Sequence, residues 1–509
     1  MDIFKLNSIP SEIKTSCIFK ELFEKNILIE IDIFFCSHYL KTAKNIHSDV
    51  FLFLAFVSYL IRKGHLCFSL EKKLFPKELI KFFDNFINGS QKIPNITKDL
   101  LFTIYNNLWY PKRYFEEEKT LLKNIIRIHK QKPYLVFKKL LKTSNLLTKK
   151  QISILKKMCN MSLCLICGGP GTGKTFLAIE FVNLFLSKFP NSIVKILAPT
   201  GKVVSNFKEK IDEKKFLNLS IQTIHSFINE IKNEETCPED LILVDEGSMI
   251  DANIFSKLLS YIKNHSRLII LGDPNQLPPI GVGNIFRDLT QSLLSNTFFL
   301  SKTLRTNVKK IKNTAEKILE QKVFSYKNLL DFENMYKYLA NEYSSLIEKN
   351  EKNLTMCVLT PLRQGLWGSL SLNKYIHEEI KKINPQLKVP IIITKNIPHL
   401  NIWNGDTGYF FEKNNYIILN KQKKQLILTQ KYFSYNYVMS IHKSQGSEYD
   451  FVHILLPSNT EFISKEILYT AVTRAKRNVE IWAEENTIKK SLDTNFSRLS
   501  GIKNLLKEL

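Results

Sequence analysis

The chain has 509 residues, of which 44% are hydrophobic and 35 are Phe, and 73 Lys and Arg against 48 Asp and Glu give a net charge of +25. This length excludes a single hydrophobic core and predicts about three or four domains. The positive charge favours a polyanionic partner such as nucleic acid. Because Lys is abundant along the whole chain, a general compositional bias is the competing interpretation of that charge.

Cysteine spacing and apolar runs narrow the class of protein further. Of the eight cysteines, only Cys164 and Cys167 have paired spacing, and no second pair or nearby His completes a zinc site. The apolar run 50–61 has 12 residues, too few to span a bilayer, and the N-terminus has no secretory pattern. We therefore expect a cytoplasmic protein with reduced cysteines, of which Cys164 and Cys167 are buried, and no association with a membrane.

The first part of the chain, residues 1–110, has the apolar periodicity of helices and many aromatic side chains, including the run 51–60 and the pair Trp109 and Tyr110. Since a large apolar surface on a domain without a ligand motif often marks an interface, we predict a helical docking domain. The alternative is that these side chains form the domain's own helical core. Residues 111–150 are rich in Lys and helical in pattern, and we expect a helical linker there.

From Gln151 onward, short apolar strands alternate with helices. The expected strands cover residues 163–167, 192–198, 241–244 and 268–271. This alternation is typical of a parallel sheet covered by helices on both faces, so residues 151–300 are predicted to form one α/β domain.

A phosphate-binding loop follows the first of these strands. Residues 168–175 read GGPGTGKT and match the pattern G-x-x-x-x-G-K-[ST] between a strand and a helix. The helix N-terminus and the loop amides favour phosphate, Lys174 is expected to reach the β- and γ-phosphates, and the Thr175 hydroxyl is expected to hold Mg²⁺. The residues predicted to bind nucleotide here are Gly168, Gly169, Pro170, Gly171, Thr172, Gly173, Lys174 and Thr175.

Acidic and amide side chains end two later strands of the same domain. Asp245 and Glu246 follow the strand 241–244, where Asp245 is expected to complete the Mg²⁺ site and Glu246 to orient the attacking water. Gln276 lies in the turn DPNQLPP and is a candidate sensor of the γ-phosphate. The alternative for Gln276 is an incidental glutamine in a turn stiffened by proline.

A second set of strands begins near residues 356–359 and returns at 451–455 and 479–482. We assign residues 301–388 and 429–509 to a second α/β domain. Between these two parts, residues 389–428 read as short strands joined by turns, which predicts a small β insertion.

The order of the motifs resembles that of superfamily 1 helicases. The strings GGPGTGKT, LILVDEGSM, LGDPNQLPP, LSKTLRTN, SIHKSQGSEYD and LYTAVTRAKR occur in that order between residue 151 and about residue 485. More narrowly, DPNQLPPIGVGNIFRDL, APTGKVV, QTIHSFI and NIWNGDTGYFF look like the RecD family, the α subunits of exodeoxyribonuclease V. The resemblance implies an α/β fold with two RecA-like P-loop motor domains, a β insertion in the second and a helical N-terminal domain.

The resemblance also implies roles for single residues. Gln151 is similar to the glutamine that recognises adenine, with an exposed helical glutamine as the alternative, and Arg305 and Arg474 resemble the two arginines that reach the γ-phosphate from the second motor domain. Residues at strand ends resemble DNA contacts, and loops that only cap strands are the alternative. The expected DNA-binding residues are Thr200, Lys202, Thr223, His225, His442, Lys443 and Gln445.

As a whole, the resemblance implies an ATP- and Mg²⁺-dependent DNA helicase that moves 5′ to 3′ on single-stranded DNA. It further implies a complex with two larger subunits resembling RecB and RecC, which processes double-strand ends for recombinational repair and carries the nuclease site on a partner chain. A free-standing helicase of the same branch and a structural subunit with a decayed ATPase are the alternatives.

Overall fold

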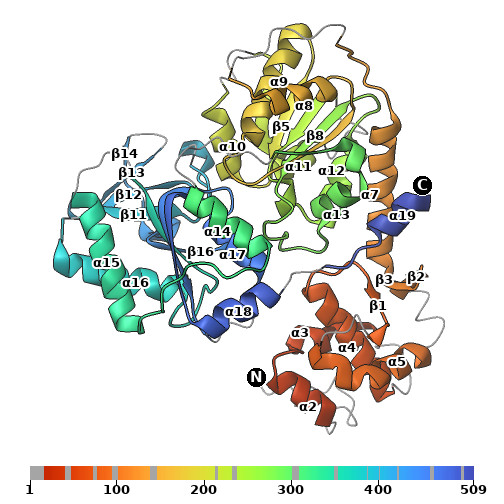
Figure 1. Ribbon diagram of the computed structural model, residues 1–509, viewed down its shortest axis with the longest axis horizontal. Helices are drawn as coiled ribbons and strands as arrows, with labels where there is room; N and C mark the ends of the chain where they lie inside the picture. Colours follow the sequence, from red (N-terminus) through yellow and green to blue (C-terminus); the bar gives the residue numbers. More distant parts are fainter. Residues whose placement is uncertain are drawn as a thin grey trace.

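The computed structural model describes residues 17–39, 47–72, 77–93, 101–137, 146–211, 216–231, 238–300, 309–348, 354–386, 388–400, 402–420, 424–458, 463–494 and 498–508. Two α/β domains, a β insertion and an N-terminal domain are visible in Figure 1. Of the helices in these ranges, none combines the length and the apolar character needed to cross a bilayer.

The first α/β domain is built on a six-stranded parallel sheet with the order β6-β5-β7-β8-β4-β9. The four expected strands are confirmed, while β6 and β9 were not expected. The strands are β4 (Leu163–Cys167), β5 (Val194–Ala198), β6 (Leu219–Thr223), β7 (Leu241–Val244), β8 (Arg267–Gly272) and β9 (Thr297–Phe299).

Helices cover both faces of this sheet, as the alternating pattern predicts, because both faces of these strands are apolar. One core lies under α8 (Lys149–Met158), α9 (Lys174–Lys188) and α10 (Gly201–Lys208). The opposite core lies under α11 (Ile224–Glu230), α12 (Ala252–Tyr261) and α13 (Ile285–Ser292).

The expected linker is a structural part of this domain. Helix α7 (Lys112–Lys130) lies along α12, and its Leu121, Leu122 and Ile125 are fully buried in the second core. Burying these side chains at helical spacing fixes α7 to the domain, so residues 112–130 do not connect two bodies loosely.

The N-terminal domain contains α2 (Cys17–Glu24), α3 (Glu30–Tyr39), α4 (Ser48–Arg62), η3 (Lys77–Phe82) and α5 (Phe83–Lys92). It also has an unexpected antiparallel sheet of β1 (Phe68–Ser69), β3 (Leu108–Pro111) and β2 (Phe102–Tyr105). Most of the aromatic run 51–60 is buried, and Trp109 packs edge-on against Phe53 with ring centroids 5.5 Å apart. These side chains therefore form the domain's own core, and the docking role stays a prediction that they do not support.

The second α/β domain has a four-stranded parallel sheet of order β16-β10-β17-β18. Its strands are β10 (Met356–Thr360), β16 (Val438–Ser440), β17 (Tyr449–Leu456) and β18 (Ala475–Ala483). Its helices are α14 (Lys309–Leu319), α15 (Phe332–Glu348), α16 (Ser369–Ile383), α17 (Lys465–Val472) and α18 (Glu485–Asp493).

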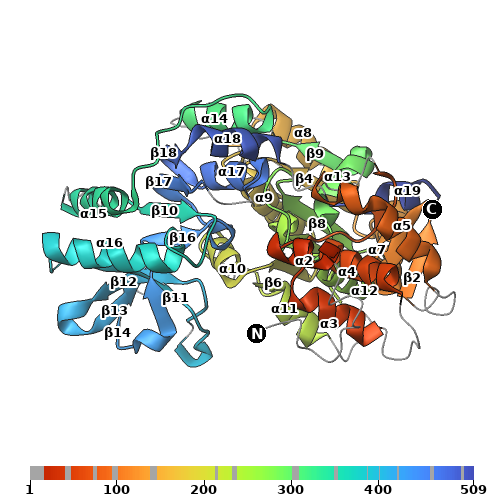
Figure 2. The same cartoon turned by 90° about the horizontal axis from the view of Figure 1, so that it is seen from below.

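The β insertion is a five-stranded antiparallel sheet of order β14-β13-β12-β11-β15. It extends past the expected end at residue 428, because β15 pairs with β11. The strands are β11 (Val389–Ile393), β12 (Thr407–Phe411), β13 (Tyr416–Leu419), β14 (Gln425–Leu426) and β15 (Phe433–Tyr435). Seen from below, α10 and β6 of the first domain lie toward the insertion and the second domain (Figure 2).

The C-terminal helix differs from its expected place in the second α/β domain. Helix α19 (Ile502–Glu508) returns to the first domain and packs on α7 and α13 (Figure 1). Ile502 and Leu505 are buried in the core beneath α12 and α13, and that burial accounts for the position.

Candidate nucleotide site and nucleic-acid cavity

The phosphate-binding loop joins β4 to α9 with the backbone that the motif requires. Gly171 and Gly173 have φ angles of +72° and +84°, in the region that favours glycine. Lys174 Nζ donates to the carbonyls of Gly168 and Gly169, the latter at 3.1 Å, so the ammonium group lies inside the loop. The loop therefore carries its positive charge where the phosphate is expected.

Close packing leaves no space for side chains at the start of the loop. A Cβ on Gly168 would lie 2.6 Å from Thr172 Oγ1 and 2.7 Å from the carbonyl oxygen of Leu300. A Cβ on Gly169 would lie 3.0 Å from Tyr469 Oη. These glycines form a cradle that fits the phosphates of a nucleoside triphosphate.

Asp245 and Glu246 follow β7 at the carboxyl edge of the sheet. Asp245 is buried, and this burial together with the charge of Glu246 raises the pKa of its carboxyl above the ordinary value. Glu246 N donates to Asp245 Oδ1 at 2.9 Å. Glu246 has a φ of +51°, a left-handed conformation that non-glycine residues adopt at a cost of about 1–3 kcal/mol and that is concentrated at functional sites. A buried acid beside Lys174 suits a divalent cation.

The turn after β8 in the first α/β domain contacts helix α17 of the second. Asp273 is buried, which raises the pKa of its carboxyl, and Tyr469 Oη of α17 donates to its Oδ2 at 2.9 Å. Gln276 Nε2 lies 3.5 Å from the same oxygen, while its Oε1 is buried without a partner among the described residues. Leu277 N donates to Thr470 Oγ1 at 2.9 Å. The second domain therefore contacts the segment that contains the candidate γ-phosphate sensor.

Gln151 is buried, which argues against the exposed helical glutamine. Its Oε1 accepts hydrogen bonds from N and Oγ1 of Thr148, both at 3.0 Å, in a capping box at the start of α8. Its Nε2 is buried without a partner in the described ranges. A donor of this kind can bond a ring nitrogen of adenine, and that role stays a prediction.

The two predicted arginines differ in what the structure shows. Arg305 lies outside the described residues. Arg474 is 2% exposed, and its guanidinium donates from Nε to the Thr470 carbonyl at 3.0 Å and from one Nη to the Ser447 carbonyl at 3.3 Å. Arg474 therefore lies next to the part of α17 that contacts Leu277, and its role at the γ-phosphate stays a prediction.

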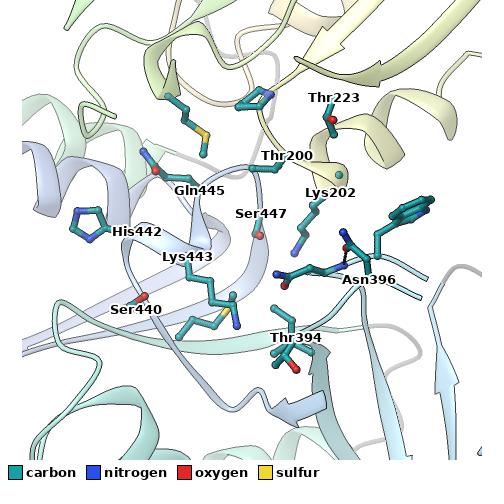
Figure 3. A pocket seen from close by; sticks show the side chains of 18 of the residues that line it. Thr200, Lys202, Thr223, Thr394, Asn396, Ser440, His442, Lys443, Gln445 and Ser447 are labelled. Atoms are coloured by element: carbon teal, nitrogen blue, oxygen red, sulfur yellow. Dashed lines mark hydrogen bonds between the residues drawn. The ribbon is translucent and has the colours of Figure 1, made fainter. Parts of the chain in front are cut away.

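All the predicted DNA-binding residues line one cavity, of about 1660 Å³, between the two α/β domains and the insertion. Lys202 reaches into it from α10 and Lys443 from the turn after β16, and their amines point toward the same space (Figure 3). The cavity walls and the charge of Arg363 lower the pKa of Lys443 from its ordinary value. The residues brought together are Thr200, Lys202, Thr223, His225, His442, Lys443 and Gln445.

The two threonines of this set are also N-caps. Thr200 Oγ1 accepts from Val203 N at 3.4 Å, and Thr223 Oγ1 accepts from Ser226 N at 3.2 Å. Because each hydroxyl is an acceptor in its cap, its proton remains available for a phosphate oxygen. The capping and DNA-contact interpretations are compatible.

Several lining residues were not predicted. Arg363 follows β10, Asn396 and the 40% exposed Trp403 lie in the insertion, and the 92% exposed Ile280 follows the DPNQLPP turn. An aromatic ring and a cation in a basic groove are the side chains that bind bases and phosphates of a single strand. The motifs NIWNGDTGYFF and DPNQLPPIGVGNIFRDL contain Trp403 and Ile280, whereas Arg363 and Asn396 lie outside the quoted motifs.

The first α/β domain matches a family model described as an AAA domain over residues 151–282, and residues 435–481 match a UvrD-like helicase C-terminal domain. The RecBCD enzyme subunit RecD of Buchnera aphidicola subsp. Schizaphis graminum is 26% identical over 92% of this chain and 98% of that protein. RecD of Mycolicibacterium smegmatis is 23% identical over 90% of this chain and 94% of its own. The ATP-dependent RecD2 DNA helicase of Deinococcus radiodurans is 25% identical over 65% of this chain and 48% of its own.

Among solved structures, the Pif1 helicase from Candida albicans covers 72% of this chain and 99% of its own at 14% identity, with a TM-score of 0.44. The predicted resemblance to RecD is confirmed by the sequence comparisons. It extends outside residues 151–485, where the motifs lie, because the alignment with the Buchnera protein includes 92% of the chain.

Proposed function

We propose that this RecD-like chain is an ATP-dependent DNA helicase that tracks along single-stranded DNA. The observation that carries the proposal is the single cavity that collects every predicted DNA-binding residue. Its walls belong to both α/β domains, and the same two domains meet at the turn beside the phosphate-binding loop. A change at the nucleotide can therefore alter the distance between the DNA contacts.

When bound, ATP with Mg²⁺ would supply the phosphoryl group whose transfer to water releases the free energy for movement. Lys174 offers its charge to the phosphates, and Thr175 and Asp245 provide the oxygen ligands that Mg²⁺ prefers. Glu246 would orient the attacking water, and Gln276 would sense the γ-phosphate. Arg305 and Arg474 stabilise negative charge when the two domains close.

Coupling between the two sites runs through the segment after β8. Gln445 Nε2 donates to the Leu277 carbonyl at 3.4 Å, and Asn206 Nδ2 donates to the Gly446 carbonyl at 3.2 Å. Leu277 follows the sensor Gln276 directly, while Gln445 is a DNA-cavity residue. One short segment therefore contains the candidate γ-phosphate sensor and contacts a residue of the DNA cavity.

We further propose that the chain acts 5′ to 3′ as a subunit beside two larger subunits resembling RecB and RecC, with DNA cutting assigned to a partner. The RecBCD name of the relatives supports this assembly. The N-terminal domain is the proposed docking element, and Ile31 and Phe34 of α3 are 59% and 52% exposed. Replacing both with Lys should abolish co-purification with the partners and leave ATP turnover intact. Unchanged co-purification would contradict docking through α3.

The helicase proposal is tested by strand separation. Duplex DNA with a 5′ single-stranded tail should be unwound in the presence of ATP and Mg²⁺, and a duplex with only a 3′ tail should not. A blunt duplex incubated with the isolated chain is the control, because strand separation without a single-stranded tail would report melting without translocation. Unwinding that is absent with both tails, although ATP is hydrolysed, would contradict the function.

A further inference from the structure

The C-terminal segment joins three parts of the molecule that are distant in sequence. Leu499 N donates to His65 Nδ1 at 3.1 Å, and Leu66 N donates to the Leu499 carbonyl at 3.0 Å. Ser500 Oγ donates to Asp288 Oδ2 at 2.8 Å, and Gly501 N donates to Glu118 Oε1 at 3.0 Å. The segment thus bonds to the N-terminal domain, to α13 and to α7.

Arg498 begins this segment and holds a loop of the first α/β domain. One Nη donates to the Gly281 carbonyl at 2.6 Å and to the Gly283 carbonyl at 2.9 Å. On the other side, a Cβ on Gly64 would lie 2.4 Å from Arg498 Cζ, and Gly283 N donates to the Gly64 carbonyl at 2.8 Å. The guanidinium is packed between the N-terminal domain and this loop.

The loop that Arg498 holds is a wall of the DNA cavity. Pro279, Ile280 and Gly281 line the cavity. Ile280 is 92% exposed, so the loop presents a bare apolar side chain toward the space proposed for DNA. After burial, the charge of Arg498 is the next cause that lowers the pKa of His442, another cavity residue.

The same segment connects directly to the second α/β domain. Thr494 N donates to the Lys490 carbonyl at 3.0 Å and the Thr494 carbonyl accepts from Lys465 N at 3.2 Å, which fixes Thr494 to α18 and α17. Four residues of extended chain reach about 14 Å, so Thr494 and Arg498 cannot separate further than that. Movement of the second domain away from the loop is therefore limited.

We infer that Arg498 is a positioning residue for DNA binding: it fixes the 279–283 loop against the N-terminal domain, so that Ile280 faces the strand in the cavity. The inference rests on the proposed DNA-tracking function. Both carbonyls accept from one Nη of Arg498. The planar guanidinium, packed against Gly64, fixes the direction of these bonds, which an ammonium on the flexible Lys stem does not. Arg498 lies outside both the nucleotide site and the lining of the cavity, so we expect it to act on DNA only through the 279–283 loop.

The test compares the full-length chain with Arg498→Ala, Arg498→Lys and Gly64→Ala. A Cβ at residue 64 displaces the guanidinium from the opposite side and also strains a backbone whose φ is +90°, so the melting temperature of this variant separates the two effects. Lys503→Ala is the matched control, because Lys503 is an exposed cation on the same segment. The readouts are the oligonucleotide concentration that half-saturates ATP turnover, the KM for ATP, and the melting temperature. A polydeoxythymidine oligonucleotide is the probe.

We expect Arg498→Ala and Gly64→Ala to raise the half-saturating oligonucleotide concentration about tenfold, the change that corresponds to one charge-assisted hydrogen bond. Arg498→Lys should restore little of the oligonucleotide affinity. The KM for ATP should stay unchanged in all variants, and Lys503→Ala should leave the half-saturating oligonucleotide concentration unchanged. An unchanged half-saturating concentration, or equal losses for ATP and DNA, would overturn the inference. If the wild-type chain shows no stimulation by the oligonucleotide, the proposed function fails instead.

Discussion

The nucleotide site and the DNA cavity are built in different ways. Apart from Arg305 and Arg474, the predicted nucleotide residues come from the first α/β domain, and all of these except Gln151 of α8 lie in short segments that follow strands of one sheet. The cavity takes residues from both α/β domains and the insertion, and contiguous motifs supply only some of them. A site within one sheet keeps its geometry when domains move, whereas a shared cavity changes with every movement. This difference is what a translocating motor needs.

The comparison predicts that variants of the nucleotide site stop ATP turnover without preventing DNA binding. Lys174→Gln should abolish hydrolysis and unwinding, because the phosphates lose a point charge while the loop glycines keep the backbone. Lys188→Gln, at the exposed end of the same helix, is the control. ATP turnover and oligonucleotide binding measured together check this, and a variant with wild-type turnover would show that the site is misassigned.

Arg474→Ala tests the contribution of the second domain to the first site. Hydrolysis should fall by a factor of about 10³–10⁵, the usual effect of an arginine that stabilises the transition state, while nucleotide affinity changes little. Because Arg474 is buried, the melting temperature of the Arg474→Ala variant must also be measured. Lys476→Ala, a change at a less buried neighbour, is the control. A loss confined to nucleotide affinity would contradict closure of the two domains over the nucleotide.

Trp403→Ala should act on DNA alone. Stacking of a base on an aromatic ring contributes about 1–3 kcal/mol, so oligonucleotide affinity should fall about 5- to 150-fold. Trp403→Phe should retain much of the affinity, and basal ATP turnover should not change. Equal oligonucleotide affinity for the Ala variant and the wild type would contradict a contact between Trp403 of the insertion and DNA.

Tyr469→Phe should have the smallest effect, and it should weaken the coupling between the DNA cavity and the nucleotide site. It removes the hydrogen bond to Asp273 and keeps the ring, so the ratio of DNA-stimulated to basal turnover should fall about fivefold. The measurement is turnover with and without oligonucleotide at saturating ATP. A lower melting temperature with an unchanged ratio would mean that this contact only stabilises the fold.

Local signals account for which features were predictable from the sequence. The phosphate-binding loop, the strands before it and after it, and the two acids after β7 each depend on residues close in sequence. The hairpin of β2 and β3 was not predicted. Its turn residues Asn106 and Asn107 have φ angles of +49° and +60°, which Asn tolerates better than most residues, so the Asn pair was a local signal for the turn.

Other features have no local signal because distant segments create them. An amphipathic pattern predicts that α19 is a helix, but its position on α7 depends on the cores that Ile502 and Leu505 fill. Arg363 and Asn396 are recognisable as cavity residues only after the domains have been placed beside each other.

The most direct test of the account is ATP turnover by the full-length chain with and without single-stranded DNA, in the wild type and in a Lys202→Ala, Lys443→Ala double variant. Both lysines point into the cavity and neither belongs to the nucleotide site (Figure 3). We expect DNA to stimulate wild-type turnover strongly, and we expect the double variant to need far more DNA while keeping the same basal turnover. Wild-type turnover that does not respond to DNA would contradict it.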